Sequence, residues 1–164
     1  MGCRERRKNC TADKQIMKKE TVHQTCLDML DKKIEMARHG MEEAQASANN
    51  ETKSSAGDKY ETGRAMSQRE RDLHARQLSE VLNMKKTLST IDPKRTFSVV
   101  ELGALVKTNS SLFYISASLG AIKIKDQQVM AISAISPIAQ IILGKKAGDT
   151  FEWLKKEDQV LLIS

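Results

Sequence analysis

Residues 20–48 read ETVHQTCLDMLDKKIEMARHGMEEAQASA and predict one long amphipathic helix. Apolar side chains recur in this stretch at steps of three and four residues, which places them along one face of a helix. Charged residues fill most positions between them, so we expect the other face to be solvated. No proline, which would break a helix, interrupts the stretch. The apolar positions are Val22, Cys26, Leu30, Ile34, Ala37, Met41, Ala44 and Ala48.

A second helical segment follows and ends near residue 91. Each segment runs for roughly 28 residues, which corresponds to about 40 Å of helix. Helices of this length with narrow apolar stripes bury little surface alone, so we expect an antiparallel hairpin, a coiled coil. Small side chains at Ala44, Ala46 and Ala48 would let the two backbones approach closely near the tip. The second stripe consists of Leu73, Leu78, Val81, Leu82, Leu88 and Ile91.

The turn of this hairpin is predicted at residues 49–63, where Asn, Ser and Gly are enriched. Asp58 could cap the second helix, with Glu61 three residues on as its partner in a capping-box-like arrangement. Basic residues on the second helix favour either a face that contacts phosphates or an ordinary solvated surface, since acidic residues are interleaved with them. These basic residues are Arg64, Arg69, Arg71, Arg76, Lys85 and Lys86.

The pattern changes after Asp92-Pro93, because a proline disfavours helix for the residue before it. Residues 137–143 predict one short helix, with Ser136 as its cap, Pro137 in its first turn and Gly144 as its stop. The remainder predicts a small β domain, so the fold class is α+β, with a helical hairpin followed by strands around one helix. The expected strands are residues 98–101, 104–108, 112–116, 121–124, 129–132 and 159–163.

The net charge of +6 is concentrated at the start of the chain. Residues 1–19 carry seven basic side chains against two acidic ones, a net +5, and form a basic arm before the hairpin (20–92) and the β domain (93–164). The arm could bind polyanions such as DNA, or be a disordered extension, or lie upstream of a true start at Met17. No apolar run approaches the roughly 20 residues of a membrane span, and no signal peptide is apparent. We expect a cytoplasmic protein.

The cysteines do not form a recognisable site. Cys3, Cys10 and Cys26 are an odd number without a CxxC pair, which argues against a disulfide framework or a zinc site. His23 lies three residues before Cys26 and could share its helical face. A thiolate nucleophile or metal half-site there lacks a third ligand or an orienting carboxylate, so we do not expect one.

Four stretches together resemble the Gre-type bacterial transcription factors. Residues 133–149, SAISPIAQIILGKKAGD, are similar to the family signature SPIGxALLGKKxGD. Residues 102–106 (LGALV) and 160–163 (VLLI) resemble the entry strand and the last strand of the family's FKBP-like domain. The tip sequence Gly57-Asp58-Lys59-Tyr60-Glu61 resembles the family's GDxxE tip. The order of hairpin and β domain also matches, so the resemblance covers residues 20–164.

The resemblance implies a factor that inserts its hairpin into the secondary channel of RNA polymerase and stimulates cleavage of backtracked RNA. Asp58 and Glu61 would help to hold a catalytic magnesium shared with the polymerase, which makes the protein a stimulator rather than an enzyme. Arg64, Arg69, Arg71 and Arg76 would contact the nascent RNA 3′ end or the channel wall. The β domain would dock on the polymerase through Ser136, Pro137, Ile138 and Lys145.

The chain departs from the family directly after the tip, where Thr62-Gly63-Arg64 stands in place of the usual NAEY. This departure supports an alternative, a secondary-channel regulator that competes with cleavage factors without stimulating cleavage. The FKBP likeness suggests a more remote alternative, a prolyl isomerase, which would need an apolar pocket lined by aromatic residues. A plain coiled-coil adaptor is a third possibility.

Overall fold

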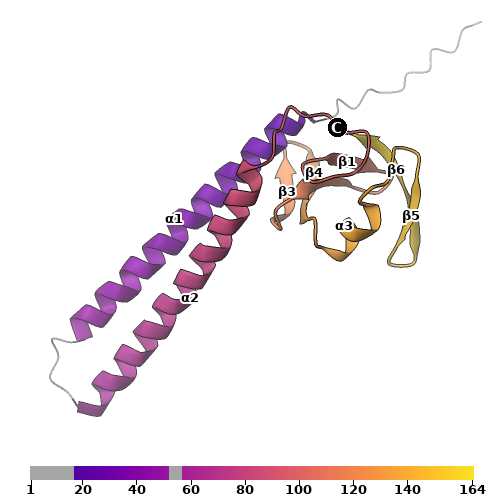
Figure 1. The fold of residues 1–164 in the computed structure, drawn as a ribbon. Coiled ribbons are helices and arrows are strands. Elements are labelled where there is room, and N and C mark those ends of the chain that lie inside the picture. Colours follow the sequence, from indigo (N-terminus) through magenta and orange to yellow (C-terminus); the bar gives the residue numbers. More distant parts are fainter. Residues whose placement is uncertain (1–16, 52–56) are drawn as a thin grey trace, which may run out of the picture.

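The molecule is a long helical hairpin joined to a sheet domain (Figure 1). The computed structural model describes residues 17–51 and 57–164, with the backbone only at 51 and 57–60. Helix α1 (Lys19–Glu51) and helix α2 (Gly57–Ser89) run side by side in opposite directions. Each helix has 33 residues, about 50 Å. They are longer than expected because both continue into the segment that predicted the turn.

The sheet domain contains six strands and one short helix. The strand order is β3-β4-β2-β1-β6-β5, and all neighbours are antiparallel except β2 and β4, which are parallel. Helix α3 (Pro137–Ile142) follows β4 and covers one face. This architecture confirms the α+β prediction. The strands are β1 (Leu105–Thr108), β2 (Leu112–Ser116), β3 (Gly120–Ile124), β4 (Gln127–Ser133), β5 (Thr150–Trp153) and β6 (Lys156–Ile163).

One predicted strand does not form, and one observed strand was not predicted. Residues 98–101 form only an isolated bridge, Val99 with Lys146, although Val100 also exchanges backbone hydrogen bonds with residues 144 and 145. Strand β5 was not predicted, because Thr150 and Glu152 give it a polar exposed side and only Phe151 is buried. The strand depends on β6, which lies beside it through a tight turn at Leu154 and Lys155.

Side chains of the central strands alternate between two apolar cores. In β2, Tyr114 points into the core shared with the hairpin, whereas Phe113 and Ile115 point into the core beneath α3. Strand β2 is therefore apolar from Leu112 to Ile115, as expected for a strand covered on both faces, and ends in the buried Ser116. The first core joins side chains from both helices to the sheet, so the base of the hairpin and the sheet pack as one unit. Its helical members are Val22, Cys26, Leu30 and Leu88, and Ile91 joins them just after the end of α2.

The junction between hairpin and sheet contains one close backbone approach. Gly103 has φ +93°, and a Cβ there would lie 2.8 Å from Cγ2 of Ile91. Only glycine accommodates both the conformation and the contact. The segment after α2 can therefore fold tightly under the hairpin and enter β1.

A buried polar pair also fixes this junction. His23 on α1 and Tyr114 on β2 share a hydrogen bond of 2.8 Å between Nδ1 and the phenol oxygen. Burial lowers the pKa of His23; nearby Asp92 partly opposes this, while Lys19 adds to it. The neutral ring is thus the form that the folded protein favours.

We expect the stability of the protein to fall as the pH drops below about 6.5, the usual pKa of an unfolded histidine. Below that pH the unfolded state binds a proton at His23 more readily than the folded state does. The contribution of neutral His23 to the free energy of unfolding is therefore fully present above that pH and is lost as the pH falls toward the lowered pKa of the folded state. Urea unfolding at about pH 7.5 and about pH 5.5 checks this. The decrease in the free energy of unfolding between the two pH values should be smaller in His23→Gln than in the unchanged protein. An equal decrease in both proteins would contradict the prediction.

The seam between the helices differs from the predicted stripe of α2. Leu73 and Leu82 are 51% and 42% exposed, so the prediction that both line the seam was wrong. Ser67 and Leu88 are buried there, with partly buried His74 and Val81 between them at steps of seven residues. A seven-residue step keeps side chains on the seam of two paired helices. The predicted stripe of α1 is confirmed, since six of its eight members are buried and Met41 and Ala48 are half-buried.

Candidate functional site

The tip of the hairpin carries the predicted pair of acidic residues. Helix α2 begins at Gly57, so Asp58 and Glu61 both belong to its first turns. The side chain of Glu61 is exposed, whereas that of Asp58 lies outside the described residues. Residues three apart on a helix lie on the same side. Because α2 already begins at Gly57, Asp58 lies within the first turn and not at the N-cap position, so the capping expectation was wrong. The magnesium role stays a prediction, and the described part of the chain holds no cluster of three or more metal-ligating side chains.

The four predicted arginines form two rows on α2. Arg64 and Arg71 are seven residues apart and lie on one side of the helix, and Arg69 and Arg76 have the same spacing. The two rows are separated by about 140° of helical rotation, since residues 64 and 69 differ by five positions at about 100° each. All four side chains are exposed. They therefore cannot act as one basic face.

The row of Arg64 and Arg71 borders a polar groove of about 160 Å³ between the helices. Arg71 Nη1 donates to Oε1 of Gln45 on α1, at 2.9 Å, and so ties the two helices together. Buried Ser67 and half-buried Ala48 form the floor of the groove near the tip. Small and polar residues dominate this half of the hairpin, whereas the half near the sheet is sealed by leucine and valine.

The row of Arg69 and Arg76 lies on the opposite flank, interleaved with exposed apolar side chains. Met66 is 64% exposed and Leu73 is 51% exposed. Met66 and Leu73 are seven residues apart from each other, so they lie on one line along the helix. This flank of α2 combines cationic and apolar groups, which is typical of a protein-contact surface more than of a purely phosphate-binding one.

The middle of the hairpin has a close approach that the sequence pattern did not predict. A Cβ at Gly40 would lie 2.6–2.8 Å from three ring atoms of His74. The ring therefore fills the space that any side chain at position 40 would need. Nδ1 of His74 is buried and has no hydrogen-bond partner among the described residues. The sequence feature that could have indicated this close approach is a glycine within a long predicted helix.

The effect of replacing Gly40 by alanine on the free energy of unfolding should therefore depend on His74. Alanine favours helix by about 1 kcal/mol over glycine, but the added methyl group displaces the ring, and such overpacking costs about 1–3 kcal/mol. We expect Gly40→Ala to destabilise the protein alone and to stabilise it by about 1 kcal/mol in a His74→Ala background. A double-mutant cycle in urea measures this coupling. Equal effects in both backgrounds would mean that the ring does not fill the space.

Three of the predicted docking residues, Ser136, Pro137 and Ile138, lie at the start of α3, and Lys145 follows its end. Ser136 takes the N-cap position, but its hydroxyl donates to the carbonyl of Ser133 at 2.7 Å and caps no helix N–H group. Pro137 is exposed, Lys145 is half-buried, and Ile138 is only 8% exposed. Ile138 thus packs in the core beneath α3, and an outside partner would touch its neighbours instead. Ile135, which is 84% exposed, is the neighbour that the sequence pattern did not single out.

Ile135 and Ser136 border the inner corner between the hairpin and the sheet. A groove of about 480 Å³ there runs from Asn83, Met84 and Thr87 on α2 to Ile135 and Ser136. In Figure 1, α2 is the helix nearer the sheet domain and faces this corner. The groove and the apolar row of α2 lie on the same side of the hairpin, so one partner could contact both.

Within the described residues, Cys26, His23 and Tyr114 show no catalytic arrangement. Burial raises the pKa of Cys26 to about 11, so its thiol is protonated and unreactive at neutral pH. Burial raises the pKa of Tyr114 as well. His23 bonds to that phenol and not to a carboxylate. These three residues form part of the shared core and have no geometry for acyl transfer.

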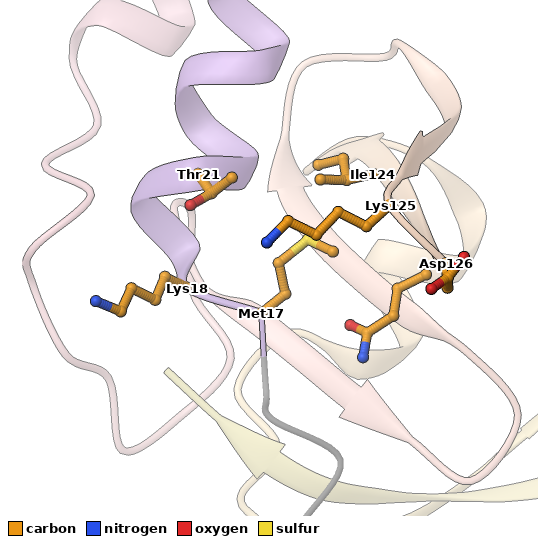
Figure 2. A pocket seen from close by; sticks show the side chains of 7 residues that line it. Met17, Lys18, Thr21, Ile124, Lys125 and Asp126 are labelled. Carbon is orange, nitrogen blue, oxygen red and sulfur yellow. The ribbon is translucent and has the colours of Figure 1, made fainter.

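A further set of grooves lies at the end of the hairpin away from its tip. Met17, the first described residue, lines the groove in Figure 2 together with Lys18 and Thr21 of the α1 start and Lys125 and Asp126 of the β3–β4 turn. Lys125 has φ +54°, which turns the chain sharply between the two strands. Its ammonium group reaches toward α1.

Comparisons with known proteins give little further information. No protein-family model matches the chain, and no curated protein matches it. Among solved structures, the chain is similar to one described as "Structure of the transcription factor Gfh1", with 19% identity over 84% of this chain and 92% of that chain and a TM-score of 0.34. A similarity at this level assigns neither a family nor a function, and we base the proposed function on the chain's own residues. No helix among the described residues is both long and apolar enough to cross a membrane.

Proposed function

We propose that the protein is a transcription elongation factor that inserts its hairpin into the secondary channel of RNA polymerase and stimulates cleavage of backtracked RNA. One feature carries the proposal: the sequence GDKYE, which resembles the Gre tip, lies where α2 begins, at the far end of helices about 50 Å long. A narrow rod of this length can carry two carboxylates into a channel that a globular domain cannot enter.

In this proposal the chemistry belongs to the polymerase. Hydrolysis of a phosphodiester at a two-metal site needs a second cation and a positioned water molecule. Magnesium is often bound through only one or two protein carboxylates. Asp58 and Glu61 would supply these ligands, and the protein would not act as an enzyme alone.

The remaining surface would hold the hairpin in place. Arg64 and Arg71, nearest the tip on the grooved side, are suited to the RNA 3′ end, because contacts with phosphates are chiefly electrostatic. Arg69 and Arg76, next to the exposed row of Met66 and Leu73, are better suited to the channel wall. The rim of the polymerase would contact Ser136 and Pro137 at the start of α3 and Lys145 after its end. Ile135 would be the apolar contact, and Ile138 would support α3 from the core.

A regulator that occupies the channel without stimulating cleavage is the second candidate. The observation that favours it is the sequence Thr62-Gly63 directly after the tip, where the Gre pattern has NAEY. A prolyl isomerase is much less favoured. Phe113, Tyr114 and Phe151 are buried in the cores, and Lys19 and Arg95 cover the ring of Phe97.

The deciding experiment is RNA cleavage in backtracked elongation complexes formed with the cognate polymerase. Shortened RNA 3′ ends that appear only with the protein would support the cleavage factor. Unshortened RNA, with inhibition of a known cleavage factor, would support the regulator instead. Neither effect with an active polymerase would refute both proposals.

A further inference from the structure

Three grooves meet at Met17, at the end of the hairpin farthest from its tip. They measure about 300, 330 and 660 Å³ and share Met17 in their walls. The first lies against the β3–β4 turn (Figure 2), the second against the β1–β2 turn, and the third against residues 93–96 and the end of β6. We refer to the lining of these grooves as the junction surface.

The junction surface is basic. Its lining contains six basic residues against two acidic ones, Glu20 and Asp126, and the carboxylate of Asp158 lies beside the second groove, bonded to Thr108, Asn109 and Ser110. The whole chain after residue 19 carries 20 basic and 19 acidic residues, a net +1, so such an excess is local. The six basic residues are Lys18, Lys19, Lys94, Arg95, Lys107 and Lys125.

Two of these cations are used within the fold. Lys19 is 8% exposed, bonds to the carbonyl of Arg95, and lies 4.6 Å from the ring centre of Phe97. Arg95 lies over the same ring at 4.9 Å and pairs with Glu101 at 3.5 Å. Their contacts stabilise the junction and leave them little freedom to bind a ligand.

The other four lysines form no salt bridge with the side chains of residues 17–50 and 61–164. Lys18, Lys94 and Lys125 are exposed and Lys107 is half-buried. They come from four different segments of the chain that only the tertiary structure brings together. Four unpaired cations around connected grooves are a suitable surface for a polyanion.

We propose that the junction surface binds the phosphate backbone of double-stranded nucleic acid without reading its sequence. Phosphates are contacted chiefly by lysine and arginine, helped by amide and hydroxyl side chains, and Thr21, Gln127 and Gln128 line the same grooves. Ser110 is not among these donors, because its hydroxyl is bonded to Asp158. This site is remote from Asp58 and Glu61 and needs no polymerase.

The surface suits a duplex better than a single strand. Proteins that bind single strands stack the bases on aromatic side chains. Among the described residues, none that lines these grooves is aromatic, and the ring of Phe97 is already covered by Lys19 and Arg95. Membranes are less favoured because peripheral binding surfaces insert large apolar side chains. The preceding residues 1–16 add five basic and two acidic side chains, a net +3, directly before Met17.

The test measures binding of the full chain to a labelled DNA duplex of about 20 base pairs by fluorescence anisotropy, between about 50 and 200 mM salt. The quadruple variant Lys18→Gln, Lys94→Gln, Lys107→Gln, Lys125→Asn removes the four unpaired cations, with asparagine chosen at 125 because it tolerates a positive φ. Each lost phosphate contact lowers the slope of log K against log salt by about 0.9, so we expect a reduction of about 3–4. Affinity at the lower salt should fall at least about tenfold.

The control variant removes the same charge elsewhere. Lys32, Lys33 and Lys86 become glutamine, and Lys155, which also has a positive φ, becomes asparagine. This variant should bind the duplex almost as well as the unchanged protein. A second variant, Arg4→Gln, Arg6→Gln, Arg7→Gln, Lys8→Gln, tests the arm in the full chain and should weaken binding less than the junction variant does.

Three results would overturn the proposal. Equal losses in the junction and control variants would mean that only net charge matters. Loss in the arm variant with full binding by the junction variant would assign binding to the arm. Tighter binding to a single strand of the same length, or binding only to vesicles containing phosphatidylserine, would assign the surface to another ligand.

Discussion

The double variant Asp58→Ala, Glu61→Ala is expected to lose stimulated RNA cleavage while it keeps its affinity for the polymerase. If both carboxylates hold the second magnesium, their removal leaves the metal and its water unpositioned, and we expect the stimulated rate to fall at least about 100-fold. The measurement is the rate of RNA shortening in backtracked complexes, together with competition binding to the polymerase.

Two further variants separate the metal role from a structural role at the start of α2. Asp58→Asn keeps the shape of the side chain and removes its charge. It weakens metal binding, so the magnesium concentration for half-maximal cleavage should rise. Glu70→Ala, Asp72→Ala removes the same charge from exposed positions farther along α2 and should cleave normally. Full activity of Asp58→Ala, Glu61→Ala would eliminate the metal role and favour the channel regulator.

The second large effect is expected from Leu88→Ala. Leu88 is fully buried in the core that the two helices share with the sheet. Truncating a buried leucine leaves a cavity and costs about 2–5 kcal/mol, and here the loss should reach both parts of the molecule. Urea unfolding should show the same shift in helical circular dichroism as in the fluorescence of Trp153, the single tryptophan, which lies on β5.

The control for this variant is Leu82→Ala on the same helix. Leu82 is 42% exposed, so its truncation should change the free energy of unfolding by less than about 1 kcal/mol. The two probes also test the shared core itself. A shift of the helical signal without a shift of the Trp153 signal would show that the hairpin and the sheet unfold separately, contrary to our expectation.

The sequence by itself determined the elements whose signals are local. The spacing of apolar residues from Val22 to Ala48 predicted α1 and its buried face, because helix periodicity depends only on neighbours three and four positions away. The Ser136-Pro137 pair and Gly144 placed α3 within one residue of its observed end. The change of pattern at Pro93 separated helices from strands. These features sufficed for the fold class and for the candidate tip.

Only the tertiary structure decided features that depend on a partner distant in the chain. Strand β5 forms because β6 lies beside it, and residues 98–101 stay a single bridge because residues 144–146 offer no longer strand. Leu73 looked like a seam residue, but the position of α1 places His74 opposite Gly40. The unpaired lysines of the junction surface come from four separate segments. Such contacts follow from packing between elements, and no local pattern in the sequence encodes them.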